Sequence, residues 1–321
     1  MTQTQIATPS RAVGQPELVA AALLAALLGG GWIRGFLDGE AFTTWTTIFV
    51  AVVVQSLPFL VGGVLLSALI ARFLTEGVLR RALPRNPVAA VPVAGLAGVG
   101  LPGCECAAVP IADGLIRRGL KPAVALTFLL AAPAINPAVI VSTAVAFAGN
   151  PAMVVARVLA SLATACLVGW WCLARGSRLR LQRRARAHAH NEGFWATARH
   201  DLLYAGGFLV LGAMIAAAVN TFVPRGIVDS VAGQALLAAL VMAAFAFFAA
   251  LCSESDAFVA ASLTAFSDTA KLVFLVVGPA MDVKLAAMES GQFGLPFARQ
   301  FVPVVLVVAV SMASLVGWWL L

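Results

Sequence analysis

The stretch that decides the fold runs from Pro122 to Ala148 and reads PAVALTFLLAAPAINPAVIVSTAVAFA. It contains no charged residue, and it is longer than the roughly 20 residues that an α-helix needs to cross the hydrocarbon core of a bilayer. The stretch therefore predicts a membrane-spanning helix. Because Asn136 lies between Pro133 and Pro137, we expect this helix to be broken there.

The composition of the whole chain also indicates a membrane protein. Hydrophobic residues make up 61% of the 321 residues and charged residues only 11%, whereas soluble domains are about half apolar and about a quarter charged. One core of this length cannot enclose so many apolar side chains. The composition therefore excludes a soluble enzyme and a disordered protein, and the five cysteines, all in apolar surroundings, do not suggest a disulfide scaffold.

Further apolar runs predict further spans, so the fold class is an all-α polytopic membrane protein. The predicted spans are 18–33, 44–74, 122–148, 151–174, 201–222, 267–283 and 299–321. Two more apolar stretches are interrupted by polar or helix-breaking residues and do not read as single helices. They are 88–116 and 229–266.

Lys and Arg set the orientation, because cytoplasmic loops of membrane proteins carry an excess of them. The richest cluster lies in the linker 175–200, which we assign to the cytoplasm together with Lys284 and most other basic residues. Each interrupted stretch must then enter and leave the membrane on the same side. The stretch 88–116 does so from the cytoplasm, and 229–266 does so from outside. The C-terminus at Leu321 is expected outside the inner cell membrane.

The two halves of the chain resemble each other. Phe59-Leu-Val-Gly-Gly63 matches Phe208-Leu-Val-Leu-Gly212, and Phe128 to Asn136 matches Phe274 to Asp282. Each unit has three spans and one hairpin, so the second copy is expected to be inverted, and one extra helix precedes the first copy. The predicted parts are 1–43 (tail and first helix), 44–174 (first repeat), 175–200 (cytoplasmic linker) and 201–321 (second repeat).

Inverted repeats with broken helices are the architecture of secondary transporters, whose substrate sites lie where the breaks meet. Ionisable groups inside a membrane are usually functional, although carboxylates and serines there can also act as helix caps. The candidate substrate-binding residues lie at the tips of the two interrupted stretches, 101–106 and 252–256, and at two helix breaks. The second break is expected at Asp282, which follows Pro279 and is the counterpart of Asn136 in the second half. The candidates are Cys104, Glu105, Cys106, Cys252, Ser253, Glu254, Asp256, Asn136 and Asp282. Of these, Asp282 was expected nearer the cytoplasmic interface.

Three cysteines fall at the predicted tips. Cys104 and Cys106 form a Cys-x-Cys pair, and the repeat offset brings Cys252 opposite them. Soft thiolates select metalloids and soft metals, so these three residues are the candidate metal or metalloid ligands. The alternative is that they are small packing residues, which is our interpretation of Cys166 and Cys172.

The sequence resembles the predicted permease family that includes the ArsP organoarsenical efflux permeases. The resemblance rests on Gly100-Leu-Pro-Gly-Cys-Glu-Cys-Ala-Ala-Val-Pro110, on Phe128 to Pro137, and on Leu251 to Phe258. It implies a permease that exports a soft metalloid species such as a trivalent organoarsenical, with thiol ligands at Cys104, Cys106 and Cys252. At the tip of the first hairpin the family usually has Cys-Ser-Cys-Gly, whereas this chain has Cys-Glu-Cys-Ala. The added carboxylate of Glu105 could also bind a divalent cation, so a cation substrate remains open.

Two other functions remain open at this point: a zinc or cobalt permease, and the membrane subunit of a multi-protein permease complex. We expect no enzymatic activity and no cofactor, since no nucleotide-binding or hydrolase motif occurs. The expected partners are the lipid bilayer, a small inorganic or organometalloid substrate and a proton as coupling ion. The protein could also associate with a second copy of itself or with a partner subunit. We expect no binding to nucleic acid.

Overall fold

The computed structural model describes residues 40–73, 84–100, 105–176, 194–222 and 234–321. The predicted first span at 18–33 lies outside these residues, as does Cys104. Within the described ranges every regular element is helical.

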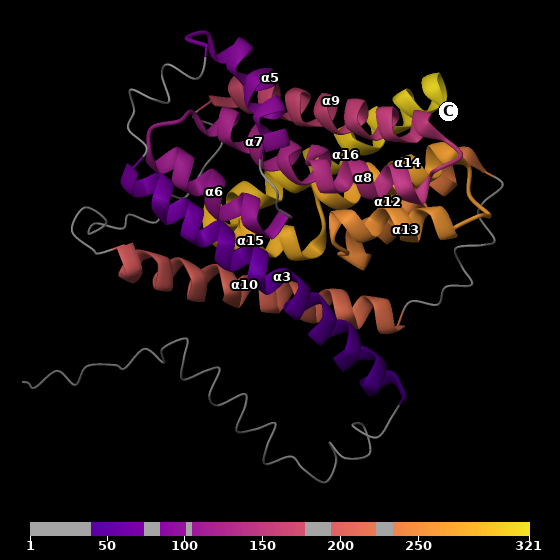
Figure 1. Ribbon diagram of the computed structural model, residues 1–321, viewed down its shortest axis with the longest axis horizontal. Helices are drawn as coiled ribbons and strands as arrows, with labels where there is room; N and C mark the ends of the chain where they lie inside the picture. The colour runs from indigo at the N-terminus through magenta and orange to yellow at the C-terminus, as the bar shows by residue number, and fades with distance from the viewer. Residues whose placement is uncertain (1–39, 74–83, 101–104, 177–193, 223–233) are drawn as a thin grey trace, which may run out of the picture.

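The two halves of the described chain have the same order of helices (Figure 1). Each has a long helix, two short helices, a pair of helices on either side of a break, and a second long helix. The first half comprises α3 (Glu40–Phe73), α5 (Pro87–Ala97) with a 3-10 turn (Gly98–Gly100), α6 (Glu105–Arg117), α7 (Pro122–Ile135), α8 (Pro137–Ala146) and α9 (Pro151–Arg175). The second comprises α10 (Phe194–Phe222), α12 (Ala235–Ala249), α13 (Ser253–Ser262), α14 (Asp268–Ala280), α15 (Val283–Phe293) and α16 (Leu295–Leu320). The inverted relation between the halves stays a prediction.

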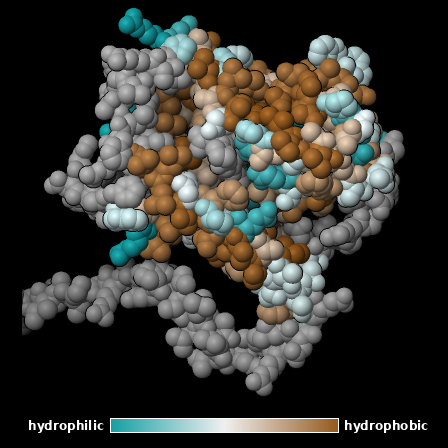
Figure 2. Space-filling model, viewed as in Figure 1, coloured by the Kyte–Doolittle hydropathy of each residue, from teal (hydrophilic) through white to brown (hydrophobic). Residues whose placement is uncertain are grey.

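The described chain has the helices that a polytopic membrane protein requires. Four segments are long and apolar enough to cross a bilayer, namely Ala41–Ser67, Pro122–Ala146, Pro151–Arg175 and Leu295–Leu320. Figure 2 shows hydrophobic residues over much of the described surface on this face. Such a surface suits lipid, and the expected all-α membrane class is confirmed.

The helices of the two interrupted stretches are too short to span. α5 and α6 have 11 and 13 residues, and α12 and α13 have 15 and 10. At 1.5 Å per residue these helices are about 15 to 22 Å long, whereas the hydrocarbon core is about 30 Å thick. Their lengths fit hairpins that enter and return.

The break expected at Asp282 is confirmed, but the run 267–283 does not form one spanning helix. α14 ends at Ala280, and the chain resumes as α15 after Met281 and Asp282, which both have extended backbone conformations. Pro279 removes one backbone donor in the last turn of α14, which favours an end there. The expected break at Asn136 is confirmed, because α7 and α8 flank it. Asn136 precedes Pro137, and a residue before proline is disfavoured from the helical region.

The helix pair α3 and α10 crosses along one side of the molecule, and α9 runs along the opposite side (Figure 1). Two matched glycines let these helices approach the half-helices. A Cβ at Gly63 of α3 would lie 2.6 Å from Ala107 Cα of α6, and one at Gly212 of α10 would lie 2.5 Å from Lys284 Cα of α15. Small residues at such contacts are typical of membrane helix packing.

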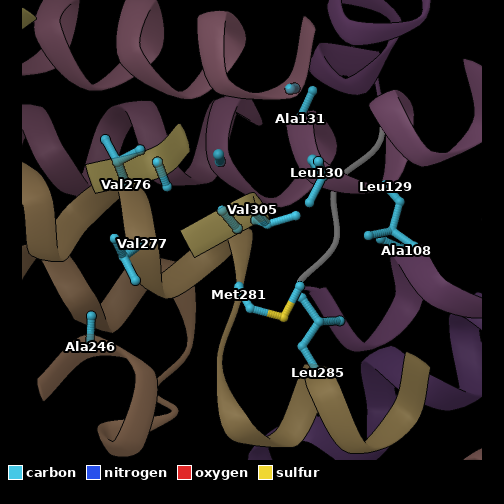
Figure 3. Close-up of a cluster of buried hydrophobic side chains, with 14 of the residues drawn as sticks. Ala108, Leu129, Leu130, Ala131, Ala246, Val276, Val277, Met281, Leu285 and Val305 are labelled. Carbon is cyan, nitrogen blue, oxygen red and sulfur yellow. The ribbon is translucent and has the colours of Figure 1, made fainter. Parts of the chain in front are cut away.

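The buried core joins the two halves. Figure 3 shows side chains of α6, α7, α12, α14, α15 and α16 in one cluster, with Met281 and Leu285 close together. The broken helices therefore lie inside the protein, where the backbone groups freed by the breaks can find partners other than lipid.

Candidate functional site

The two hairpin tips meet. Ser253, the first residue of α13, donates a hydrogen bond from Oγ to Oε2 of Glu105, the first residue of α6, over 3.0 Å. Both side chains are buried. The expected proximity of the tips is thus confirmed for this pair, whereas Cys104 lies outside the described residues.

The second oxygen of Glu105 binds a lysine that the charge rule had assigned to the cytoplasm. Lys284 Nζ lies 2.7 Å from Glu105 Oε1, 3.1 Å from the carbonyl oxygen of Ala250 and 3.4 Å from Asp282 Oδ2. Lys284 is 1% exposed, so its placement in a cytoplasmic loop is wrong. The positive-inside rule counts basic residues near the ends of spans and takes no account of buried carboxylates that could pair with them. Lys284 follows the break at Asp282 by only two residues, so it lies close to such carboxylates.

The break residues Asn136 and Asp282 have equivalent roles. Asn136 Oδ1 accepts a hydrogen bond from the backbone N–H of Val139 at 2.9 Å, and Asp282 Oδ1 accepts one from Leu285 N–H at 2.5 Å. Each side chain thus caps the helix that follows the break, where backbone donors lack helical partners. Both are fully buried, so Asp282 lies in the protein interior rather than on an exposed surface.

A second buried cation reaches the same tip from α9. Arg157 donates from Nη1 to Thr143 Oγ1 at 2.6 Å and from Nη2 to the carbonyl oxygen of Ser253 at 2.9 Å. The carboxylates of Asp256 and Glu254 act on it electrostatically. Arg157 lies within the predicted span 151–174 and was not among the candidate binding residues, although the sequence offered it as a partner for carboxylates in the membrane interior.

Ser253 therefore joins two buried charge clusters, because its hydroxyl binds Glu105 and its carbonyl binds Arg157. We call the resulting set the tip network. It consists of Lys284, Glu105, Ser253, Arg157 and Thr143. These residues come from α15, α6, α13, α9 and α8, so the network ties the hairpins to both broken helices.

The described tip cysteines lie beside this network. Cys106 follows Glu105 and is fully buried. Cys252 precedes α13, is 7% exposed and donates from Sγ to Glu254 Oε2 at 2.7 Å. Both are thiols rather than disulfides. Within the described ranges no group of three potential metal ligands occurs, and the expected third sulfur, that of Cys104, falls outside them.

Three half-helices begin at this place. The first turns of α6, α13 and α15 carry Glu105, Ser253 and Lys284, which are linked by hydrogen bonds. Helix N-termini carry positive partial charge, and Lys284 and Arg157 add two full charges. The carboxylates of Glu105, Asp282 and Asp256 offset them, so the tips form a compact site of nearly balanced charge.

A polytopic helical protein whose short hairpins and broken helices meet at buried polar groups is built as a membrane permease. The comparisons agree, because residues 41–318 match the ArsP_1 family, described as "Predicted permease". The chain belongs to this family.

Two curated relatives match along nearly their full length. A UPF0718 protein, YcgR, of Bacillus subtilis (strain 168) is 32% identical over 288 residues, which cover 86% of this chain and 98% of the relative. A "Putative two-component membrane permease complex subunit" of Streptococcus mutans is 30% identical over 282 residues, covering 84% and 94%. No solved structure gives a significant match.

Proposed function

We propose that the protein is a secondary permease that exports a small, soft metalloid species, such as a trivalent organoarsenical, from the cytoplasm. In this proposal the cargo passes between the hairpin tips and binds the thiols of Cys104, Cys106 and Cys252. Asn136 and Asp282 hold the half-helices around it, while the linker 175–200 lies in the cytoplasm and Leu321 outside the inner membrane.

The observation that carries the proposal is the contact between Glu105 and Lys284. Glu105 is the departure from the family's usual tip and was the main reason to expect a divalent cation. Its carboxylate is already engaged by Lys284 and Ser253, and Asp282 lies 3.4 Å from the same ammonium. A zinc or cobalt ion would have to displace that ammonium, whereas a neutral metalloid needs only the thiols beside it.

Uptake into everted membrane vesicles tests this function, since an exporter fills such vesicles. The panel is methylarsenite, arsenite, zinc and cobalt, with vesicles from cells lacking the protein as control. The proposal expects methylarsenite to accumulate and the two metal ions not to. Accumulation of zinc or cobalt without methylarsenite would support the divalent-cation alternative instead.

A second candidate function has support from the Streptococcus mutans relative, which is named as a subunit of a two-component permease complex. In this alternative the chain transports only together with a partner subunit. Purified protein in liposomes separates the two functions. Transport by the chain alone excludes an obligatory partner, and activity that appears only when the protein encoded beside it is added supports one.

A further inference from the structure

Glu289 is a buried carboxylate that the tip network does not use. It lies on α15, seven residues after Asp282, and is 0% exposed. Neither carboxylate oxygen has a hydrogen-bond partner among the described residues. A carboxylate in a membrane protein interior without a cation or a donor is costly, and such a group takes up a proton instead.

Among the residues that the structure describes, none supplies a positive charge to Glu289. Asp282 of its own helix acts on it electrostatically, and Glu289 acts in turn on the Cys172 thiol of α9. The remaining ionisable side chains on the helices packed against α15 either have partners of their own or are exposed. Besides the Cys106 thiol, in the described part of these helices they are Glu105, which binds Lys284; Asp113 and Arg117, which bind each other; Tyr204, which donates to the Gly291 carbonyl; and Arg199 and Arg299, which are exposed.

The position of Glu289 suits a group that meets the cytoplasm in one state of a transport cycle. Its neighbour Cys172 lies less than one turn from the end of α9 at Arg175, where the Arg-rich linker begins. At 1.5 Å per residue, Glu289 lies about 10 Å along α15 from Asp282 and hence from the tips. It therefore stands between the tip network and the basic end of the molecule.

We propose that Glu289 is the proton-binding site that couples transport to a proton. The inference rests on the proposed transport function and adds a coupling residue to it. In the closed state the proton stays bound to a Glu289 oxygen, because the carboxyl is buried and neither oxygen has a hydrogen-bond partner among the described residues. When α15 moves and the cytoplasmic half opens, the carboxyl meets water and releases the proton. The next proton binds from the outer side, through the hairpin tips, when that half of the molecule is open, so one proton moves inward with each cycle of export.

The first test needs no cargo. Infrared spectroscopy of the purified protein at neutral pH detects the carbonyl stretch of protonated carboxyl groups. We expect Glu289→Gln to remove such a band, because Gln has nearly the same shape but no acid proton. The matched control is Asp268→Asn, at a half-exposed carboxylate paired with Lys271, which should leave the band unchanged. An undiminished band in Glu289→Gln would overturn the inference whatever the cargo.

The second test measures coupling in liposomes loaded with a pH-sensitive dye, with methylarsenite as the probe. Wild type and Asp268→Asn should move protons when methylarsenite is added, whereas Glu289→Gln should pass methylarsenite down its own gradient without them. Equal proton movement in Glu289→Gln, or arsenical flux in wild type without protons, would overturn the coupling. Absence of any wild-type methylarsenite flux would instead count against the proposed function and leave the infrared result to decide the protonation of Glu289.

Discussion

The ammonium of Lys284 lies 2.7 Å from Oε1 of Glu105 across 179 sequence positions, and neither side chain is more than 2% exposed. The contact joins the first residue of α6 to the second residue of α15, so it fastens a hairpin from one half of the chain to a broken helix from the other. It is the strongest connection in the tip network, because both partners are charged and little water reaches them.

Removing one partner of this pair should be far worse than removing both. Lys284→Met leaves Glu105 buried without a cation, and we expect the protein to lose about 3 to 5 kcal/mol of stability. Lys284→Met combined with Glu105→Gln should recover most of that loss. Thermal unfolding in detergent measures both.

The partly buried pair of Lys271 and Asp268 provides the control for that experiment, because solvent reaches its carboxylate. Its Nζ lies 3.2 Å from Asp268 Oδ1, and the Asp268 side chain is 42% exposed. Lys271→Met should cost at most about 1 kcal/mol. If Lys284→Met proved as mild as Lys271→Met, the Lys284–Glu105 pair would not hold the tips together.

Ser253→Ala should weaken the junction between the two charge clusters. The variant removes the hydrogen bond to a charged acceptor, Glu105, which is worth about 1.5 to 3 kcal/mol, while the backbone carbonyl that receives Arg157 remains. Ser262→Ala is the matched control, since its hydroxyl bonds only within the same exposed helical turn. Equal melting temperatures for the two variants would contradict the junction role.

Gly212→Val should displace α15 and with it Lys284. Even a single Cβ at this position would lie 2.5 Å from Lys284 Cα, which is backbone and cannot swing away. Overpacking of this kind typically costs about 1 to 3 kcal/mol. Gly62→Val serves as the control, because a Cβ there meets nothing within 4 Å. Both stability in detergent and transport should fall in Gly212→Val, and unchanged values would refute the close α10–α15 contact.

Topology is testable without transport. A phosphatase fused after Leu321 should be active and a fluorescent protein in the same place dark, because the basic residues predict a cytoplasmic linker 175–200 and the predicted spans that follow it are odd in number. A bright fluorescent fusion would mean that at least one hairpin crosses the membrane completely.

Much of the fold was predictable because apolar length is a strong signal. The spans that became α3, α9 and α16, and the break at Asn136, follow from hydrophobic runs and from proline chemistry. The second break, at Asp282 after Pro279, was predicted from its match to Asn136 in the first half, but the helix that follows it, α15, was not predicted. A proline near a helix end tells little about whether the chain resumes as a helix two residues later.

The site was only half predictable. Glu105 and Ser253 were singled out as charged or polar residues at breaks, and the structure brings them together. The role of Lys284 was hidden, since a lysine near a membrane end is usually an orientation signal. Arg157 and Glu289 required three-dimensional contacts, because a helix periodicity does not reveal which distant helix lies against a polar residue.

The most direct test of the central claim, that thiols at the tips bind the cargo, is methylarsenite uptake by serine variants in everted vesicles. Cys106→Ser and Cys252→Ser should abolish uptake at normal protein levels, since serine nearly preserves volume but is a hard ligand. Cys166→Ser, at a buried cysteine that packs against α5 and α7, should retain wild-type uptake. Full uptake in the double variant of Cys106 and Cys252 would contradict the thiol mechanism.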